Sequence, residues 1–174
     1  MLILQSIYKR IAINHIIAPH GITDLFHAYN NHNYRSLFLS YGGSLIISQI
    51  VCPLSINNYS KILLFVMSIV HFNRDFKIVS KHKITSYLLS TLNTSLLVFY
   101  PEPYLYLYMV FVHVPNHYYQ NRVLIDKYRI ATIISVFSLG SFMYVLERYY
   151  SDKLYSLFIG IIIGHIIYNE IANR

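Results

Sequence analysis

Long apolar segments separated by short polar stretches run along the whole chain. Seven such segments occupy residues 11–27, 36–54, 61–75, 84–100, 104–119, 130–146 and 154–171. A helix needs about 20 apolar residues to cross a bilayer, so this pattern predicts membrane spans. Several segments are short for a full crossing, which makes one of them a candidate for a re-entrant or interfacial segment. We therefore expect an all-α, polytopic transmembrane bundle of about six to seven spans.

The composition agrees with this prediction. Apolar residues make up 55% of the 174 positions and charged residues only 12%, which is too little polar surface for a soluble globule of this size. No repeat, linker or second domain is visible, so residues 1–174 are expected to form a single integral membrane domain. Cys52 is the only cysteine, which excludes an intramolecular disulfide.

The basic residues lie mainly in the polar stretches between the apolar segments. If all seven segments cross, the more positive side is the one that holds the C-terminus, so the positive-inside rule predicts a multi-pass protein with a cytoplasmic C-terminus. The formal charge of +7 forms no dense lysine and arginine stripe, so a nucleic-acid partner is not expected.

Four histidines lie inside or at the ends of the apolar segments: His20, His71, His113 and His117. A buried ionisable side chain in such a segment is costly and is usually functional. In the predicted topology the first, third and fifth spans run in the same direction, and each carries its histidine in its later half. The four imidazoles would then lie at similar depth, which predicts a metal site between these three spans.

His113 and His117 are four residues apart, so a helix places both imidazoles on one face, near enough to bind one ion. Pro115 between them should disturb the hydrogen bonds of the helix and open room in its core. Pro19 and Gly21 flank His20 and predict a kink there.

Asp24 follows His20 by four residues, and Asp75 follows His71 by the same interval. A carboxylate one helical turn from a ligating imidazole can accept its second ring N–H, which fixes the tautomer and raises the basicity of the ligand. Asp24 and Asp75 are therefore candidates for residues that support the ligands. His165 also lies late in an odd-numbered span and is a candidate neighbour of the site.

The segment Pro19-His20-Gly21-Ile22-Thr23-Asp24 resembles the P-H-G-x-x-D signature of the Brp/Blh-type β-carotene dioxygenases. His71-Phe72 is similar to the second histidine site of that family, and His113 and His117 are similar to the two histidines that complete its iron site. The chain thus resembles a short, divergent member of the family.

This resemblance implies a non-haem Fe(II) enzyme that uses O₂ to cleave β-carotene, or a related carotenoid, at its central double bond to give retinal. The implied iron ligands are His20, His71, His113 and His117. The implied partners are a carotenoid, O₂, the lipid bilayer and a retinal-binding protein that takes the product.

Two other classes of function stay open from the residues alone. Paired histidines on neighbouring helices can hold haem, which would make the chain a bis-histidine electron-transfer protein. The histidines can also pack without a metal, as in a non-enzymatic membrane scaffold. Even for a metal site, imidazole ligands suit iron, zinc, copper or nickel, so the residues leave the ion undecided.

Overall fold

The computed structural model describes residues 12–51, 57–99, 101–149 and 151–172, and these are helical almost throughout. Cys52 and the first 11 residues lie outside the described part of the chain. The helices are η1 (Ala12–Ile17), η2 (Ala18–Gly21), α2 (Ile22–Asn30), α3 (Tyr34–Val51), α4 (Asn57–Lys77), α5 (Lys83–Phe99), α6 (Pro101–Tyr108), η4 (Met109–His113), α7 (Val114–Gln120), α8 (Arg122–Lys127), α9 (Arg129–Tyr149) and α10 (Ser151–Ala172).

The helices do not follow the predicted membrane spans. The range 11–27 divides into η1, η2 and the start of α2, and the range 104–119 divides among α6, η4 and α7. Other helices carry buried polar residues inside the apolar run, such as His71, Asn73 and Asp75 in α4. Among the described residues, no helix combines the length and the apolar character that a bilayer crossing requires. The prediction of a polytopic transmembrane bundle is therefore wrong. The predicted multi-pass membrane localisation is wrong with it, and the orientation with a cytoplasmic C-terminus loses its basis, because it was derived from the same spans.

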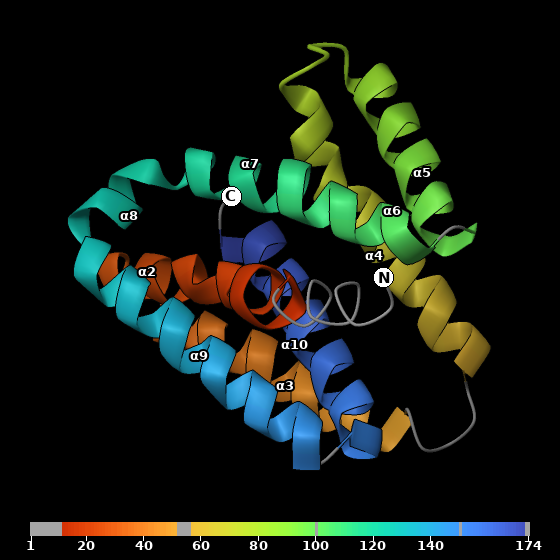
Figure 1. Cartoon of the computed structure of the whole chain (residues 1–174). Coiled ribbons are helices and arrows are strands. Elements are labelled where there is room, and N and C mark those ends of the chain that lie inside the picture. The colour runs from red at the N-terminus through yellow and green to blue at the C-terminus, as the bar shows by residue number, and fades with distance from the viewer. Residues whose placement is uncertain (1–11, 52–56, 100, 150, 173–174) are drawn as a thin grey trace, which may run out of the picture.

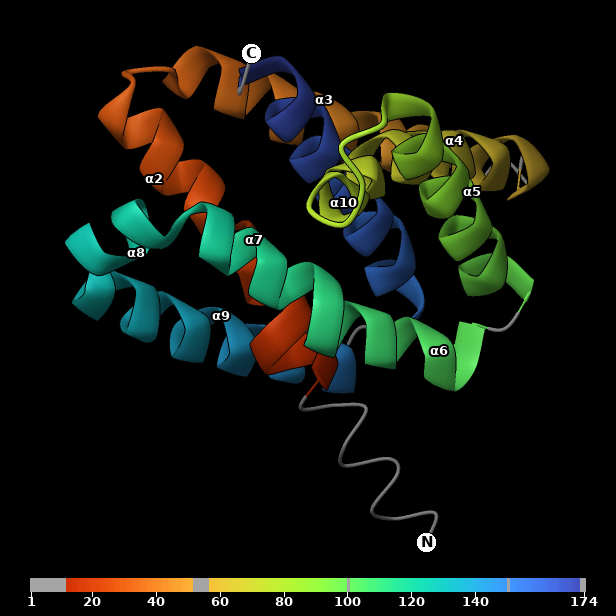
Figure 2. The same cartoon turned by 90° about the horizontal axis from the view of Figure 1, so that it is seen from above.

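Helices α3 and α10 pack side by side, and glycines on α10 allow their close approach (Figures 1 and 2). A Cβ at Gly164 would lie 2.8 Å from the Cα of Tyr41, and one at Gly160 would lie 2.9 Å from the Cα of Leu45. Side chains at these two positions would force the helices apart. The packing matters for the site because α3 carries Tyr41 and α10 carries His165.

The other helices arrange themselves around this pair. Helices α4 and α5 form an antiparallel hairpin at one end of the molecule, and α6, η4 and α7 follow one another as a single long run (Figures 1 and 2). Helix α9 returns beneath this run and packs against η1 and η2. The elements η2, α4, η4, α7 and α10 thereby approach one another in the centre.

The described interior is notably polar. Its small apolar cluster consists of Phe72, Tyr108 and Met109, whereas most other buried side chains are histidine, aspartate, asparagine, serine or threonine. Many large apolar side chains are instead exposed, for example Phe38 and Ile84. The apolar side chains that produce the hydropathy pattern therefore lie largely on the outside of the helices, and polar side chains gather inside.

Candidate metal centre

The structure brings together the four histidines that the sequence singled out. His20 lies on η2, His71 on α4, His113 at the end of η4 and His117 on α7. His71, His113 and His117 are buried, and the ring centroid of His20 lies 5.3 Å from that of His113 and 5.4 Å from that of His117. His71 lies 5.0 Å from His113. The imidazoles thus come from separate elements and meet in one place.

Irregular helix geometry at two prolines directs these side chains inward. Pro19 immediately precedes His20, and both lie in the 3-10 turn η2, which follows the π-helix η1. Pro115 lies in the first turn of α7, directly after the π-helix η4 that ends at His113. Proline cannot donate to the preceding turn, and π-bulges are frequent at functional sites. The two histidine segments therefore depart from regular α-helix where the cluster forms.

His165, which the sequence marked only as a candidate neighbour, lies within the cluster. Its ring centroid is 4.6 Å from that of His20, 5.0 Å from that of His71 and 5.1 Å from that of His117. One ligand atom each from His20, His113 and His165 lies within 4.8 Å of the others. Among the described residues, this arrangement is suited to holding a metal ion.

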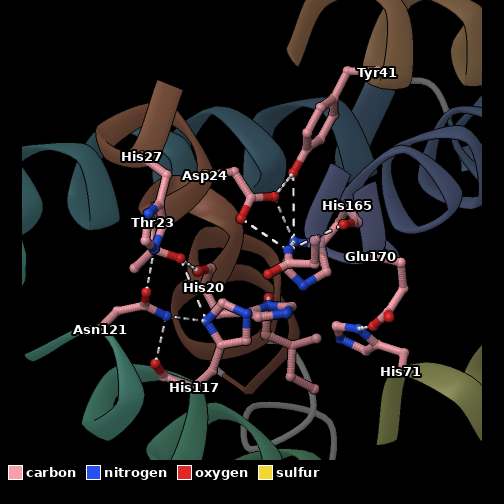
Figure 3. Close-up of polar contacts among 12 residues, drawn as sticks. His20, Thr23, Asp24, His27, Tyr41, His71, His117, Asn121, His165 and Glu170 are labelled. Carbon is pink, nitrogen blue, oxygen red and sulfur yellow. Dashed lines mark hydrogen bonds and ion pairs between the residues drawn. The ribbon is translucent and has the colours of Figure 1, made fainter. Parts of the chain in front are cut away.

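Asp24 supports His165 and not the histidine one turn before it. The Nδ1 of His165 lies 2.8 Å from Asp24 Oδ2, and since a carboxylate only accepts, Nδ1–H is the donor. Tyr41 Oη donates to the same oxygen at 2.6 Å, and Asn169 Nδ2 donates to Asp24 Oδ1 at 2.9 Å. We call Asp24, Tyr41, His165 and Asn169 the Asp24 network; Figure 3 shows Asp24 with Tyr41 and His165.

Asp75 supports His113 in a closely similar way. The Nδ1–H of His113 donates to Asp75 Oδ2 at 2.8 Å, and Tyr108 Oη donates to the same oxygen at 2.6 Å. Asn116 Nδ2 donates to Asp75 Oδ1 at 2.5 Å. We call Asp75, Tyr108, His113 and Asn116 the Asp75 network. The expectation that each aspartate supports the histidine four residues before it is corrected: both carboxylates reach a histidine on a different element.

Weaker polar contacts orient His117. Its Nδ1 lies 3.4 Å from Thr23 Oγ1, which itself donates to the carbonyl of His20. Asn121 Nδ2 lies 3.2 Å from the same ring nitrogen and donates to the His117 carbonyl at 2.8 Å, and Asn121 Oδ1 accepts from His27 Nε2 at 2.5 Å. Figure 3 shows these contacts beside the ring of His20. The ring of His117 is therefore tied to both α2 and its own helix.

His20 and His71 complete the inner surface of the cluster. His20 Nδ1 bonds to the carbonyl of Ile17, while its Nε2 is buried without a hydrogen-bond partner. Neither ring nitrogen of His71 has a hydrogen-bond partner, although Nδ1 lies 4.0 Å from Glu170 Oε1, which pairs with Arg74 Nε at 3.1 Å. His165 Nε2 is likewise buried and unsatisfied. Such atoms are rare in folded proteins, and each calls for a further partner, which can be a water molecule or an ion.

The surroundings keep His20, His71 and His117 neutral and Asp24 ionised. Burial, reinforced by the neighbouring imidazoles, lowers the pKa of His20, His71 and His117 well below the ordinary value of 6.5. Burial alone would raise the pKa of Asp24, but the charge and hydrogen bond of His165 and the hydrogen bond of Tyr41 outweigh it and lower this pKa. A neutral imidazole can bind a metal ion, and an ionised carboxylate such as that of Asp24 can support a ligand, so these protonation states suit a metal site.

The sequence did not single out four residues that complete the two networks: Tyr41, Tyr108, Asn116 and Asn169. Burial and then the charge of the aspartate raise the pKa of Tyr41 and of Tyr108, so both remain protonated and donate. The tyrosines could not be distinguished among 18 in the chain. Asn169 did carry a signal, because it follows His165 by four residues, as Asn121 follows His117.

An open groove lies beside the elements that carry His20 and His117. Its volume is about 350 Å³, and it runs between η1, the helices α7 and α8, and α9. Its lining is mostly apolar and includes Ile16, Ile125, Val136 and Phe137. This volume is in the range of small-molecule sites.

Comparison with known proteins identifies no relative: no protein-family model, curated protein or solved structure matches the chain.

Proposed function

We propose that the histidine cluster binds one Fe(II) ion and that the chain is an oxygenase that uses O₂ to cleave an apolar polyene. The residues proposed to hold the ion are His20, His71, His113 and His117. The carotenoid substrate and the central cleavage position come from the sequence resemblance.

The convergence of five imidazoles from separate elements is the observation that carries this proposal. Three of them, those of His20, His71 and His165, turn a buried Nε2 without a hydrogen-bond partner into the cluster, and the Nδ1–H groups of His113 and His165 donate to carboxylates. An imidazole whose N–H donates to a carboxylate is a more basic metal ligand with a fixed tautomer. Purely structural histidines would be expected to satisfy both nitrogens.

The protein's own side chains set the conditions for the chemistry. Iron held by imidazoles with an open coordination position supplies O₂ chemistry when it is bound. The Asp75 network fixes the ring of His113, and Thr23 and Asn121 contact the ring of His117. The burial of His71, His113, His117 and His165 limits the access of water. Cleavage of one C=C bond by O₂ places one oxygen atom on each new aldehyde, so the reaction balances without a further reductant.

The groove gives an apolar substrate a place to lie. It is formed partly by Ile16 on η1 and Tyr118 on α7, which are neighbours in sequence of the His20 and His117 segments. Most of the accessible surface of the groove is apolar, although Arg122 and Asp126 also line it, and an apolar surface suits a hydrocarbon chain.

The haem alternative has less support. Imidazole centroids within the cluster lie only 4.6 to 6.3 Å apart, and they come from five residues. A porphyrin held between two of these rings would overlap the others. The scaffold alternative would leave these buried nitrogens to bind water, and it gives no reason for five imidazoles to meet in one place.

Expression of the full chain in β-carotene-producing bacteria tests the proposal. We expect stoichiometric iron in the purified protein by elemental analysis, loss of orange colour, and retinal by chromatography. The double substitution His113→Ala and His117→Ala should abolish the metal and the product. The exposed His82 offers a matched control, since His82→Ala removes a histidine of the α4–α5 connection and should change neither.

The readouts separate the parts of the proposal. A protein without metal, or with metal that survives the double substitution, would contradict the metal centre. Stoichiometric iron without retinal would leave the metal centre intact and refute the carotenoid substrate. A Soret band in the purified protein would favour haem.

A further inference from the structure

The surroundings of His165 match those of His113 in chemistry and geometry. Both rings donate Nδ1–H to a buried aspartate at 2.8 Å, and both aspartates also accept from a tyrosine at 2.6 Å and from an asparagine. His113 is a proposed iron ligand with its carboxylate behind it. The Asp24 network equips His165 for the same role from α10, on the other side of the cluster.

The five rings contact one another in a specific pattern. His117 lies 5.1 to 6.3 Å from each of the other four. Those four form a closed cycle in the order His20, His113, His71 and His165, with centroid separations of 5.3, 5.0, 5.0 and 4.6 Å. The ring centroids therefore have the contact pattern of a square pyramid, in which one point contacts four others and those four form a closed cycle.

The separations in the cycle agree with ligation of one ion. With metal–nitrogen bonds of about 2.0–2.1 Å, the centroids of two adjacent imidazole ligands lie roughly 4.5 Å apart. The cycle is only slightly wider than this. His113 and His165, the two rings backed by carboxylates, are not adjacent in the cycle, and one ligand atom of each lies within 4.8 Å of the other.

We infer that His165 is a fifth metal ligand. With the four proposed ligands His20, His71, His113 and His117, it would bring five imidazoles to one ion. This inference rests on the proposed metal centre, although not on carotenoid cleavage. Five nitrogen donors exceed the four ligands that zinc usually takes and favour a metal with five or six coordination positions, as iron has.

X-ray absorption spectroscopy on the full chain loaded with Fe(II) tests this inference, because it counts coordinated imidazoles independently of activity. We expect five imidazoles in the unsubstituted protein. Both His165→Ala and His165→Gln should give four, and the glutamine retains a side-chain donor toward Asp24. Imidazole added to His165→Ala should restore the fifth, as expected of a vacated ligand position and not of a packing residue. His82→Ala is the matched control and should keep five.

The possible outcomes separate the two proposals. Four imidazoles in the unsubstituted protein, unchanged in the His165 variants, would overturn the fifth ligand and leave the metal centre standing. Failure of the unsubstituted chain to bind iron would overturn both. If neither variant folds, as circular dichroism would show, the count in the unsubstituted protein still decides between five and four.

Discussion

Tyr108 donates to a carboxylate that has been withdrawn from water, so its hydroxyl should contribute measurably to stability. The substitution Tyr108→Phe removes this donor from Asp75 Oδ2 and leaves the ring in place. We expect the free energy of unfolding of the metal-free chain to fall by about 1–3 kcal/mol. Chemical denaturation measures this. The exposed Tyr119 provides the control: Tyr119→Phe should change stability by less than about 0.5 kcal/mol, and equal effects of the two substitutions would contradict the role of the network.

Asp75 acts on the ion through His113, so its charge should affect metal affinity. Asp75→Asn keeps the size of the side chain and removes the charge. Loss of such a supporting carboxylate typically lowers metal affinity about 10- to 100-fold, and we expect a loss of that size for Fe(II). Competition with a chelator measures the affinity. Asp126→Asn, at an exposed aspartate of α8, should leave it unchanged, and an unchanged affinity in Asp75→Asn would argue against the proposed support.

The sequence predicted the histidines of the site better than the residues that support them. His20, His71, His113 and His117 stood out because an ionisable side chain in an apolar segment is unusual, and that signal is local. Asp24 and Asp75 were recognised as supporting residues, but spacing along one helix paired them with the wrong histidines. The observed pairs, Asp24 with His165 and Asp75 with His113, depend on how separate helices pack, which periodicity within one segment does not reveal.

At the scale of helices, the contact between α3 and α10 positions the Asp24 network. Gly164 precedes His165 and lies against the backbone of Tyr41, so Gly164→Ala should push α3 away from α10 and draw the Tyr41 hydroxyl from Asp24. We expect a loss of about 1–3 kcal/mol in unfolding free energy from overpacking, together with weaker metal binding. Denaturation and metal titration measure the two effects.

Gly43 is the matched control for this substitution. It also lies inside a helix, α3, but a Cβ there would meet no atom within 4 Å. Gly43→Ala should therefore be neutral or stabilise the chain by up to about 1 kcal/mol, because alanine favours helix more than glycine does. If Gly164→Ala were as stable as Gly43→Ala, close packing of the two helices would not be what positions the network.

Apolar periodicity located much of the helix but misjudged its continuity. The range 130–146 lies within α9, and 154–171 lies within α10. The ranges 11–27 and 104–119 break at Pro19 and near Pro115 into π-helical, 3-10 and α-helical pieces. Hydropathy sums over a window and does not register such breaks, which is why it predicted membrane spans where the described helices are too short or too polar.

For the whole molecule, the buried cluster should make stability depend on pH. Burial lowers the pKa of His20, His71 and His117 below the value of 6.5 that the unfolded chain retains. Below that pH the unfolded state binds protons that the folded state refuses, so the free energy of unfolding falls as the pH falls. Each fully titrating histidine contributes about 1.4 kcal/mol per pH unit. The lowered pKa of Asp24 adds a further loss only as the pH falls below about 3.8.

Denaturant titrations of the metal-free chain between about pH 7 and pH 5 measure how the free energy of unfolding changes with pH. This pH range begins just above the ordinary histidine pKa. His71→Leu removes one of the three titrating groups and should make the slope shallower. Bound metal competes with protons for the same nitrogens, so the loaded protein should be more stable at each pH until acid releases the ion. A stability that is constant or increases on acidification would mean that these imidazoles are not held neutral, and the basis for metal binding would fail with it.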